Sequence, residues 1–311
     1  MSPARHTRTR VTVRVPAKVN LELVVGPARA DGYHDLSTVF HAVGLYDEVT
    51  VTRAPQWSVQ VRGPYADRVP TGPENLALAA AHRLAQACPG GEPVAISIDK
   101  EIPVAGGMAG GSADAAATLV ACDLLWGMDA ERDLLDAVAA GLGSDVNFAL
   151  TGGTAIGSGR GERVAPVLGR GRYHWVFAVS DEGLSTGDVF AECDRLRAGE
   201  QIPAPEPSPA MMTALRSGEP AALAAAMSND LQEAAFSLRP QLREVLAAGL
   251  EYGALGGVVS GSGPTVAFLV SGPEGALDLA VALTASGAAH DVKRAVGPVH
   301  GAHLVETPRV S

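Results

Sequence analysis

Cysteine is scarce in this chain of 311 residues. The three cysteines, Cys88, Cys122 and Cys193, are scattered, and no pair has the spacing of zinc ligands or of a CxxC redox motif. An odd number of widely separated thiols argues against a disulfide framework. We expect the three side chains to be small core residues of a protein in the reducing cytoplasm.

Long apolar runs are also missing. No uncharged apolar stretch approaches the roughly 18 residues that a membrane-spanning helix needs. The basic start of the chain, residues 1–10, has no apolar segment behind it. The sequence therefore predicts neither a membrane partner nor a secretory signal.

Positive charge is in short supply as well. The formal net charge is −10, and the only lysines are Lys18, Lys100 and Lys293. Nucleic acid and anionic lipid both need a basic surface, so the charge argues against either as a partner. A lysine that is kept where arginines are plentiful indicates a need for a compact ammonium group.

What remains is the composition of a globular protein, with 47% hydrophobic and 19% charged residues. Strand-like and helix-like segments are mixed without regular alternation, which favours an α+β fold. The pattern of strand-like and helix-like segments changes after Gly152 and Gly153, and we expect two domains, residues 1–165 and 166–311. The expected strands are 11–15, 21–25, 48–53, 57–62, 94–99, 175–180 and 266–270, and the expected helices are 75–87, 113–126, 131–140, 188–197, 220–227, 230–236, 241–251 and 275–285.

A glycine-rich segment, residues 103–112, runs straight into one of these helices with the sequence PVAGGMAGGS. Small side chains let an anion approach the backbone, and the loop amides and the positive helix end attract phosphate. Ser112 is placed either to cap the helix or to offer its hydroxyl to a metal-bound phosphate. Neither a Walker pattern nor GxGxxG spacing is present. The segment predicts a phosphate cradle, with a flexible turn packed on the helix as the alternative.

Lys18 and Asp145 are the candidate catalytic groups. Lys18 lies in PAKVN, residues 16–20, which we expect to form a turn between two strands, and Asp145 lies in GSDVNF, residues 143–148. A carboxylate near an acceptor hydroxyl, supported by positive charge, is what phosphoryl transfer requires. From position alone, a solvated turn lysine and a helix N-cap are the alternatives.

Together with Asp31-Gly-Tyr-His34 and the second glycine cluster at residues 259–263, these motifs resemble the GHMP kinases. Within that family, they resemble the branch that phosphorylates a hydroxyl of a cytidine diphosphate conjugate of methylerythritol, on the methylerythritol phosphate route to isoprenoid precursors. The resemblance implies a two-domain fold with a ferredoxin-like second domain, a cleft between the domains, ATP and Mg²⁺ as cofactors, and Lys18 and Asp145 as the catalytic pair. It places the nucleotide on Asn75, Pro103, Val104, Ala105, Gly106, Gly107, Met108, Ala109, Gly110, Gly111, Ser112 and Ala113, with Ser112 also near the metal.

The same resemblance implies a substrate site of aromatic and polar side chains. Tyr33 and Phe190 would hold the cytosine ring between them, as stacking suits a flat base. The polar contacts would come from Asn20, His34, Lys100 and Thr186. Core packing of the aromatic rings, a satisfied turn histidine at 34 and a helix cap at Asn75 are the alternatives. The partners implied are small molecules, and the chain is expected to be a monomer or a homodimer.

The glycine segment departs from the family pattern. Ala105, Ala109 and Ala113 stand where related chains often have glycine or serine, and Asp114 adds a negative charge to the first helical turn. That charge suits the helix dipole but repels phosphate unless it points away or faces the metal. Two other functions stay open: a GHMP kinase for homoserine, mevalonate or a sugar, and a non-catalytic ligand-binding protein on the same fold.

Overall fold

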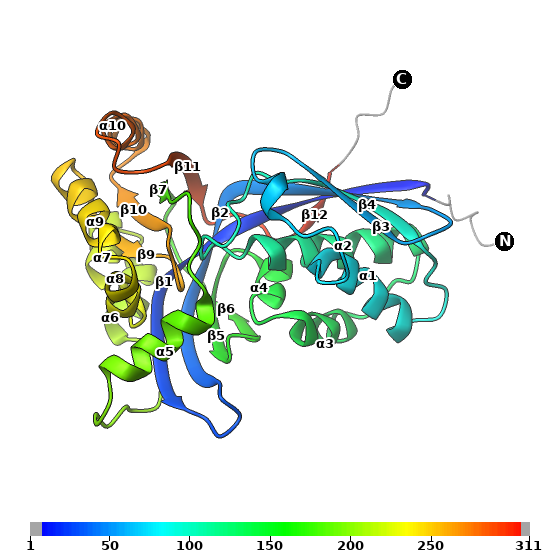
Figure 1. The fold of residues 1–311 in the computed structure, drawn as a ribbon, viewed down its shortest axis with the longest axis horizontal. Coiled ribbons are helices and arrows are strands. Elements are labelled where there is room, and N and C mark those ends of the chain that lie inside the picture. The colour runs from blue at the N-terminus through cyan, green and yellow to red at the C-terminus, as the bar shows by residue number, and fades with distance from the viewer. Residues whose placement is uncertain (1–7, 306–311) are drawn as a thin grey trace.

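Two β-sheets organise the molecule (Figure 1). The computed structural model describes residues 8–305, so the outer ends of the predicted domains lie outside the described residues. The first sheet has the strand order β12-β1-β2-β4-β3, with β5 paired to β2, β6 to β5 and β8 to β1. Its strands are β1 (Arg10–Ala28), β2 (His34–Arg53), β3 (Ser58–Arg62), β4 (Val94–Asp99), β5 (Thr154–Gly159), β6 (Arg163–Pro166), β8 (Ser228–Asn229) and β12 (His303–Leu304).

The long hairpin of β1 and β2 is the spine of this sheet. Alternate residues from Val11 to Val15 are almost completely buried, as expected of a strand with one face on the core. The turn predicted at residues 16–20 is wrong, because β1 continues through it with a register shift just after Pro16. Such an irregularity accommodates a proline that cannot donate to the ladder. Lys18 therefore projects from the middle of a strand.

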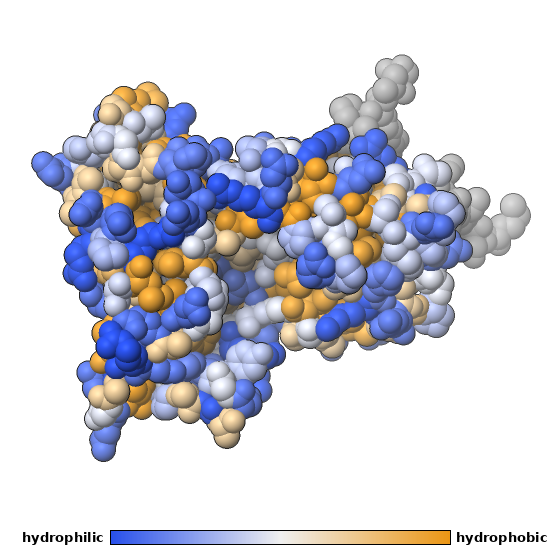
Figure 2. All heavy atoms as spheres, viewed as in Figure 1, coloured by the Kyte–Doolittle hydropathy of each residue, from blue (hydrophilic) through white to orange (hydrophobic). Residues whose placement is uncertain are grey.

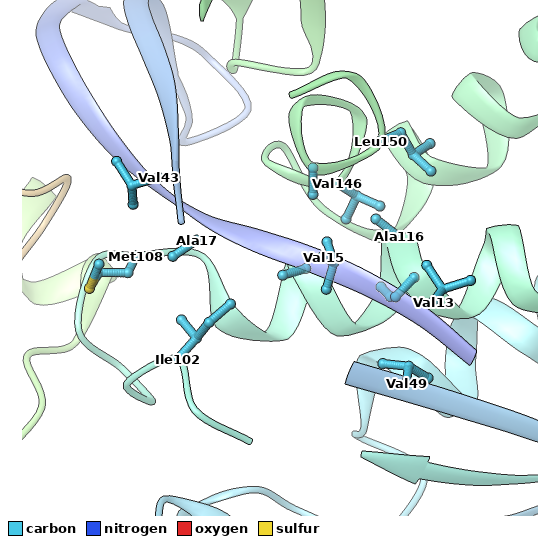
Figure 3. Packing of buried hydrophobic residues seen from close by; sticks show 14 of the residues in the cluster. Val13, Val15, Ala17, Val43, Val49, Ile102, Met108, Ala116, Val146 and Leu150 are labelled. Carbon is cyan, nitrogen blue, oxygen red and sulfur yellow. The ribbon is translucent and has the colours of Figure 1, made fainter. Parts of the chain in front are cut away.

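Helices α1 (Leu76–Ala87), α2 (Gly110–Trp126), α3 (Arg132–Leu142) and α4 (Val146–Thr151) lie together on one side of the first sheet (Figure 1). A short 3-10 helix, Ala66–Arg68, precedes them. Helix α2 contacts β1, β2, α1 and α4, and its residues from 113 to 117 are buried. Figure 3 shows Ala116 of α2 near Val146 of α4 and Val15 of β1. Small side chains in α2 allow this close packing, which fixes the helix that follows the glycine segment.

The second sheet has the order β11-β7-β10-β9 with antiparallel neighbours, which in chain order is the ferredoxin-like arrangement. The predicted two-domain α+β fold is confirmed. Its strands are β7 (Tyr173–Val179), β9 (Gly256–Val259), β10 (Val266–Val270) and β11 (Asp291–Gly297), and the helices around it are α5 (Thr186–Leu196), α6 (Pro209–Ser217), α7 (Pro220–Ala226), α8 (Gln232–Leu238), α9 (Gln241–Glu251) and α10 (Pro273–Ala285).

The two halves are interleaved along the chain. Strand β6 ends at Pro166 and β7 opens the second sheet at Tyr173, but β8 and β12 both return to β1 of the first sheet. His41 of β2 lies against Tyr173 and Trp175 of β7, so the halves also share a packed junction. Within residues 8–305, no helix has the length and apolar character needed to cross a membrane.

Candidate active site

A cleft of about 430 Å³ lies where the two halves meet. In Figure 2 the surface is hollowed between them. Strands β1 and β2, the glycine segment and the approach to α4 contribute from the first half, and α5 and the turn between β9 and β10 contribute from the second. Polar side chains in its lining are Lys18, Asn20, Thr38, Ser112, Ser144, Asp145, Arg160, Thr186 and Ser262.

Lys18 and Asp145 meet in this cleft. The Lys18 ammonium lies 3.5 Å from Asp145 Oδ2 and donates to Asn20 Oδ1 at 2.6 Å. Only 7% of the Lys18 side chain is exposed, against 28% for Asp145. The lysine is therefore fixed, while the carboxylate keeps one side open to the cleft, as a proton acceptor for a bound hydroxyl must.

Local structure explains why Asp145 is available. It stands directly before α4, at the N-cap position, but its side chain makes no cap hydrogen bond. Its carboxylate instead faces Lys18 across the cleft floor. Both positional alternatives are thus disfavoured, because Lys18 is buried in a strand and Asp145 does not cap its helix.

The glycine segment wraps one end of the cleft. Three of its residues have a positive φ: Ala105 at 54°, Gly107 at 73° and Ala109 at 60°. Ala105 and Ala109 thus adopt the left-handed conformation that glycine favours. These are two of the three alanines that stand where related chains often have glycine or serine. The residues of the segment that line the cleft are Pro103, Ala105, Gly106, Gly107, Ala109, Gly110, Gly111 and Ser112.

Three of the residues from 103 to 113 that were predicted to contact the nucleotide do not line the cleft. Met108 and Ala113 are in the hydrophobic core, and Val104 is half-buried outside the lining. Figure 3 shows Met108, in the middle of the segment, beside Ala17 of β1, with Ile102, just before the segment, nearby. These apolar side chains anchor the segment to the core, so any contact of these residues with ATP would be made by their backbone, and it stays a prediction.

The second glycine cluster packs directly on the first. Ser260 Oγ donates to the Gly107 carbonyl oxygen at 3.1 Å, and a side chain at Gly107 would collide with the Ser260 carbonyl. Asn229 fixes this turn by donating to the carbonyl oxygens of Val259 and Gly261, at 2.8 and 2.7 Å. Asn229 was missed from the sequence, because an isolated asparagine far from any motif gives no local signal.

The oxygen donors of the cleft suit Mg²⁺ that arrives with ATP. This ion commonly keeps several waters and takes one or two carboxylates together with substrate phosphates. The Asp145 carboxylate and the Ser112 hydroxyl both belong to residues that line the cleft. Residues 8–305 contain no group of three or more His, Cys, Asp or Glu side chains that would bind a metal unaided. The donor set thus fits a nucleotide-borne ion.

At the other end of the cleft, His34, Thr186 and Phe190 lie together. The rings of His34 and Phe190 are stacked with centroids 5.1 Å apart, and His34 Nε2 pairs with the Asp194 carboxylate at 2.8 Å. Thr186 and Ser262 share a hydrogen bond of 2.9 Å, which links α5 to the second glycine cluster. The predicted substrate residues of α5 therefore do face the cleft.

Tyr33 is placed differently. It lies in the tip of the β1–β2 hairpin, is 55% exposed, and carries the Arg160 guanidinium 5.0 Å above its ring centroid. Arg160 itself lines the cleft, in the turn between β5 and β6. It was missed from the sequence, although an arginine between two glycines in an acidic chain is a usable signal. Tyr33 itself is not in the cleft lining but contacts Arg160, which is.

Two further residues predicted to contact ligands, Lys100 and Asn75, do not line the cleft. Lys100 is 1% exposed and its ammonium pairs with Asp47 and Asp114, at 2.6 Å each, so it does not reach the cleft. Asn75 caps α1 by accepting from the amides of residues 77 and 78, and donates to the Pro70 carbonyl. Its amide group is thus already engaged, and the helix-cap alternative fits the structure.

Asn20 holds the Lys18 ammonium in place through a hydrogen bond. It accepts from the Lys18 ammonium and donates to Thr38 Oγ1 at 2.7 Å, and Thr38 in turn donates to the Glu22 carbonyl at 2.8 Å. This buried chain of hydrogen bonds orients the amide oxygen toward the lysine. Asn20 also lines the cleft, so a substrate contact through its remaining N–H stays a prediction.

Family models match both halves of the chain. The model described as the GHMP kinases N terminal domain matches residues 75–153, and the GHMP kinases C terminal model matches residues 211–289. The first match contains the glycine segment and Asp145. The second contains the turn between β9 and β10.

Similar curated proteins extend over almost the whole length. The 4-diphosphocytidyl-2-C-methyl-D-erythritol kinase of Mycolicibacterium smegmatis is 55% identical over 308 residues, 98% of this chain and 95% of that protein. The protein of the same name from Streptomyces coelicolor is 54% identical over 95% of this chain and 99% of its own. A crystal structure of 4-(cytidine 5′-diphospho)-2C-methyl-D-erythritol kinase matches with a TM-score of 0.74 and 34% identity, covering 91% of this chain and 98% of that one.

Proposed function

The chain belongs to the GHMP kinase family, and from this membership and the geometry of the cleft we propose how it performs its reaction. It is an ATP-dependent small-molecule kinase that uses Mg²⁺. The reaction is phosphorylation of a hydroxyl of 4-diphosphocytidyl-2-C-methyl-D-erythritol, a step of isoprenoid-precursor synthesis. The observation on which the mechanism rests is the Lys18 ammonium 3.5 Å from Asp145 Oδ2 in a glycine-lined cleft.

Asp145 is the proposed base. Its open carboxylate oxygen accepts the proton of the acceptor hydroxyl as that oxygen bonds to the γ-phosphorus, and the bond from phosphorus to the β,γ-bridging oxygen breaks to release ADP. The Lys18 ammonium offsets the negative charge that develops on the attacking oxygen. Asn20 holds the lysine in place for this role.

The glycine segment is the proposed seat of the triphosphate. Its backbone amides and the start of α2 offer hydrogen-bond donors and a positive helix end, without side chains that would keep phosphate at a distance. Ser112 is the residue that would hold Mg²⁺, which supplies positive charge to the phosphate oxygens. Arg160 adds a further cation on the hairpin side of the cleft.

The α5 end of the cleft is the proposed cytidine site. Phe190 provides a ring for stacking, and His34, whose Nε2 faces Asp194, has Nδ1 left as an acceptor when neutral, which matches the exocyclic amine of cytosine. Tyr33, on the hairpin tip, is positioned to close over the base from outside. ATP as the phosphoryl donor supports a cytoplasmic reaction. The proposed partners are small molecules, and the proposed assembly is a monomer or a homodimer.

A substrate panel with γ-labelled ATP tests the reaction. We expect label transfer to 4-diphosphocytidyl-2-C-methyl-D-erythritol that depends on Mg²⁺, with weak or no transfer to homoserine, mevalonate and free sugars. Cytidine diphosphate should compete with the conjugate, because it shares the base and the diphosphate. Turnover of homoserine or mevalonate without turnover of the conjugate would overturn the assignment, and binding of both ligands without any transfer would point to a non-catalytic protein.

A further inference from the structure

A buried ion cluster lies beneath the glycine segment. Lys100, at the end of β4, places its ammonium 2.6 Å from Asp47 Oδ2 of β2 and 2.6 Å from Asp114 Oδ2 of α2. The exposed fractions are 1%, 0% and 4% for the lysine, Asp47 and Asp114 side chains. Removing charges from water costs free energy, so a buried ion cluster needs an explanation. The reaction proposed above uses none of these three charges. We call them the Lys100 cluster.

The Lys100 cluster contacts the glycine segment at both of its ends. Asp47 Oδ1 accepts the backbone N–H groups of Glu101 and Ile102, at 2.7 and 2.9 Å, just before the segment begins. At the other end, a methyl group on Gly110 would lie 2.9 Å from the Lys100 ammonium, so the ammonium sits directly against the first residue of α2. Asp114 continues this contact one turn farther along the helix.

The charges of the cluster depend on one another. Burial works against the Lys100 ammonium, but Asp114 and Asp47 outweigh this and raise the lysine pKa. Burial raises the pKa of Asp114 well above its usual value, with the lysine opposing the rise. Asp114 points at Lys100, and its Oδ1 is buried without a hydrogen-bond partner. The carboxylate that the sequence placed near phosphate is therefore turned away from the cleft and held by the lysine.

We propose that Lys100 is a positioning residue for the nucleotide, and that the Lys100 cluster fixes the two ends of residues 103–111 at the separation that ATP binding requires. This inference rests on the proposed function, in which that segment holds the triphosphate. A lysine is needed here because a compact ammonium fits beneath Gly110 and bonds two carboxylates, whereas a planar guanidinium needs more room. If the segment is already ordered before ATP binds, less conformational entropy is lost on binding, and the affinity for ATP is higher.

Lys100→Met tests the proposal, because it keeps most of the side-chain volume and removes the charge. We expect KM for ATP to rise about tenfold or more, since small misplacements of binding groups have large effects, with KM for the cytidine conjugate changed less than about threefold. Lys293→Met is the matched control. The Lys293 ammonium pairs with Asp291 Oδ2 at a distance of 3.0 Å, and Lys293 is not among the residues that line the cleft. Its replacement should leave both KM values unchanged.

Lys100→Met leaves two carboxylates buried together and can lower the folded yield, so two further variants keep the test decisive. Asp114→Asn preserves shape and leaves Lys100 paired with Asp47, and it should raise KM for ATP by a smaller factor. The double variant Lys100→Met/Asp114→Asn removes one charge of each sign. If uncompensated charge is what displaces the segment, the double variant should recover folding and much of the lost ATP affinity.

The outcomes separate this proposal from the assignment of the nucleotide site. If Gly107→Ala raises KM for ATP while Lys100→Met and Asp114→Asn do not, the segment binds ATP and the positioning role of Lys100 is refuted. Equal rises of both KM values together with a lowered Tm would reduce the Lys100 cluster to a general stabilising role, which also refutes it. If Gly107→Ala itself leaves KM for ATP unchanged, the proposed nucleotide site fails first.

Discussion

At the scale of single residues, the active cleft depends on how Lys18 is held. Its ammonium is buried, with Asn20 Oδ1 at 2.6 Å as the nearer partner and Asp145 Oδ2 at 3.5 Å as the farther one. The shorter contact fixes the lysine, and the longer one leaves Asp145 free to bond a substrate hydroxyl. Asn20 thus holds the lysine in position, and Asp145 remains available to the substrate.

Replacing Asp145 by Asn tests the proposed base. The amide keeps the shape but cannot accept the proton, so we expect kcat to fall by roughly 10²–10⁴-fold, the usual contribution of a general base. KM for ATP and the melting temperature should change little, because Asp145 makes no cap hydrogen bond to α4. Steady-state kinetics and a thermal melt give both readings. A kcat near that of the unaltered enzyme would show that another group takes the proton.

Replacing Asn20 by Ala distinguishes two roles for this residue. As the anchor of Lys18, its loss should lower kcat about tenfold or more, since the ammonium loses its fixed position, with a small effect on KM. As a substrate contact, its loss should raise KM for the cytidine conjugate and leave kcat unchanged. Thr38→Val, which removes the hydrogen bond behind Asn20, should follow the same pattern in milder form. A change in KM alone in both variants would favour the substrate role.

At the scale of elements, the two glycine clusters form one joint. The segment before α2 and the turn between β9 and β10 touch through Gly107 and Ser260, so each cluster limits the conformation of the other. Asn229 of β8, a strand paired with β1 of the first sheet, also fixes this turn. The turn between β9 and β10 therefore supports the segment that we propose binds the triphosphate.

A methyl group at Gly107 should break this joint. Gly107 has a φ of 73°, and an added side chain would collide with the Ser260 carbonyl. We expect Gly107→Ala to lower the free energy of unfolding by about 2 kcal/mol and to raise KM for ATP. Gly111→Ala is the matched control for stability, because its methyl group would lie 3.4 Å from Leu76 Cδ1, an ordinary contact, within α2. Equal stability of the two variants in urea unfolding would contradict the expectation.

At the scale of the whole molecule, His41 couples stability to pH at the junction of the two sheets. It is fully buried between Thr154, Tyr173 and Trp175, and Thr154 Oγ1 lies 2.8 Å from its Nδ1. Burial lowers the pKa of His41 from 6.5 to about 3. The unfolded chain therefore binds a proton near neutral pH that the folded chain rejects. The stability that depends on neutral His41 is complete above pH 6.5 and is lost as the pH falls toward 3.

The linkage predicts a loss of about 2 kcal/mol from this residue between about pH 7.5 and about pH 5. His41→Asn removes the titration and keeps a polar group opposite Thr154. Denaturant unfolding at both pH values should show a drop that is about 2 kcal/mol smaller in the variant than in the unaltered protein, whatever its absolute stability. Parallel pH dependences would mean that His41 is protonated inside the fold.

Several features could be predicted from the sequence because they depend on neighbours along the chain. The composition and the mixed strand and helix patterns predicted an α+β fold, which is confirmed, and helix α9 and strands β4 and β10 lie at the predicted residues. The order of the motifs predicted the GHMP family and the kinase reaction, which are confirmed. The turn at residues 16–20 was wrong because a proline between two strand-like runs looks the same whether a register shift absorbs it or the chain reverses.

The remaining features were decided by contacts between distant segments. The Lys100 ammonium pairs with Asp114 of α2 and with Asp47 of β2, which is distant in the sequence. These ion pairs keep Lys100 away from the substrate and Asp114 away from the phosphate. Asn229 of β8 and Arg160 of the turn between β5 and β6 contact segments that they meet only after folding. A residue type and its spacing determine what a side chain is able to do. Burial and partners brought from elsewhere decide what it does, because charge and hydrogen bonding depend on what lies within a few ångströms in space.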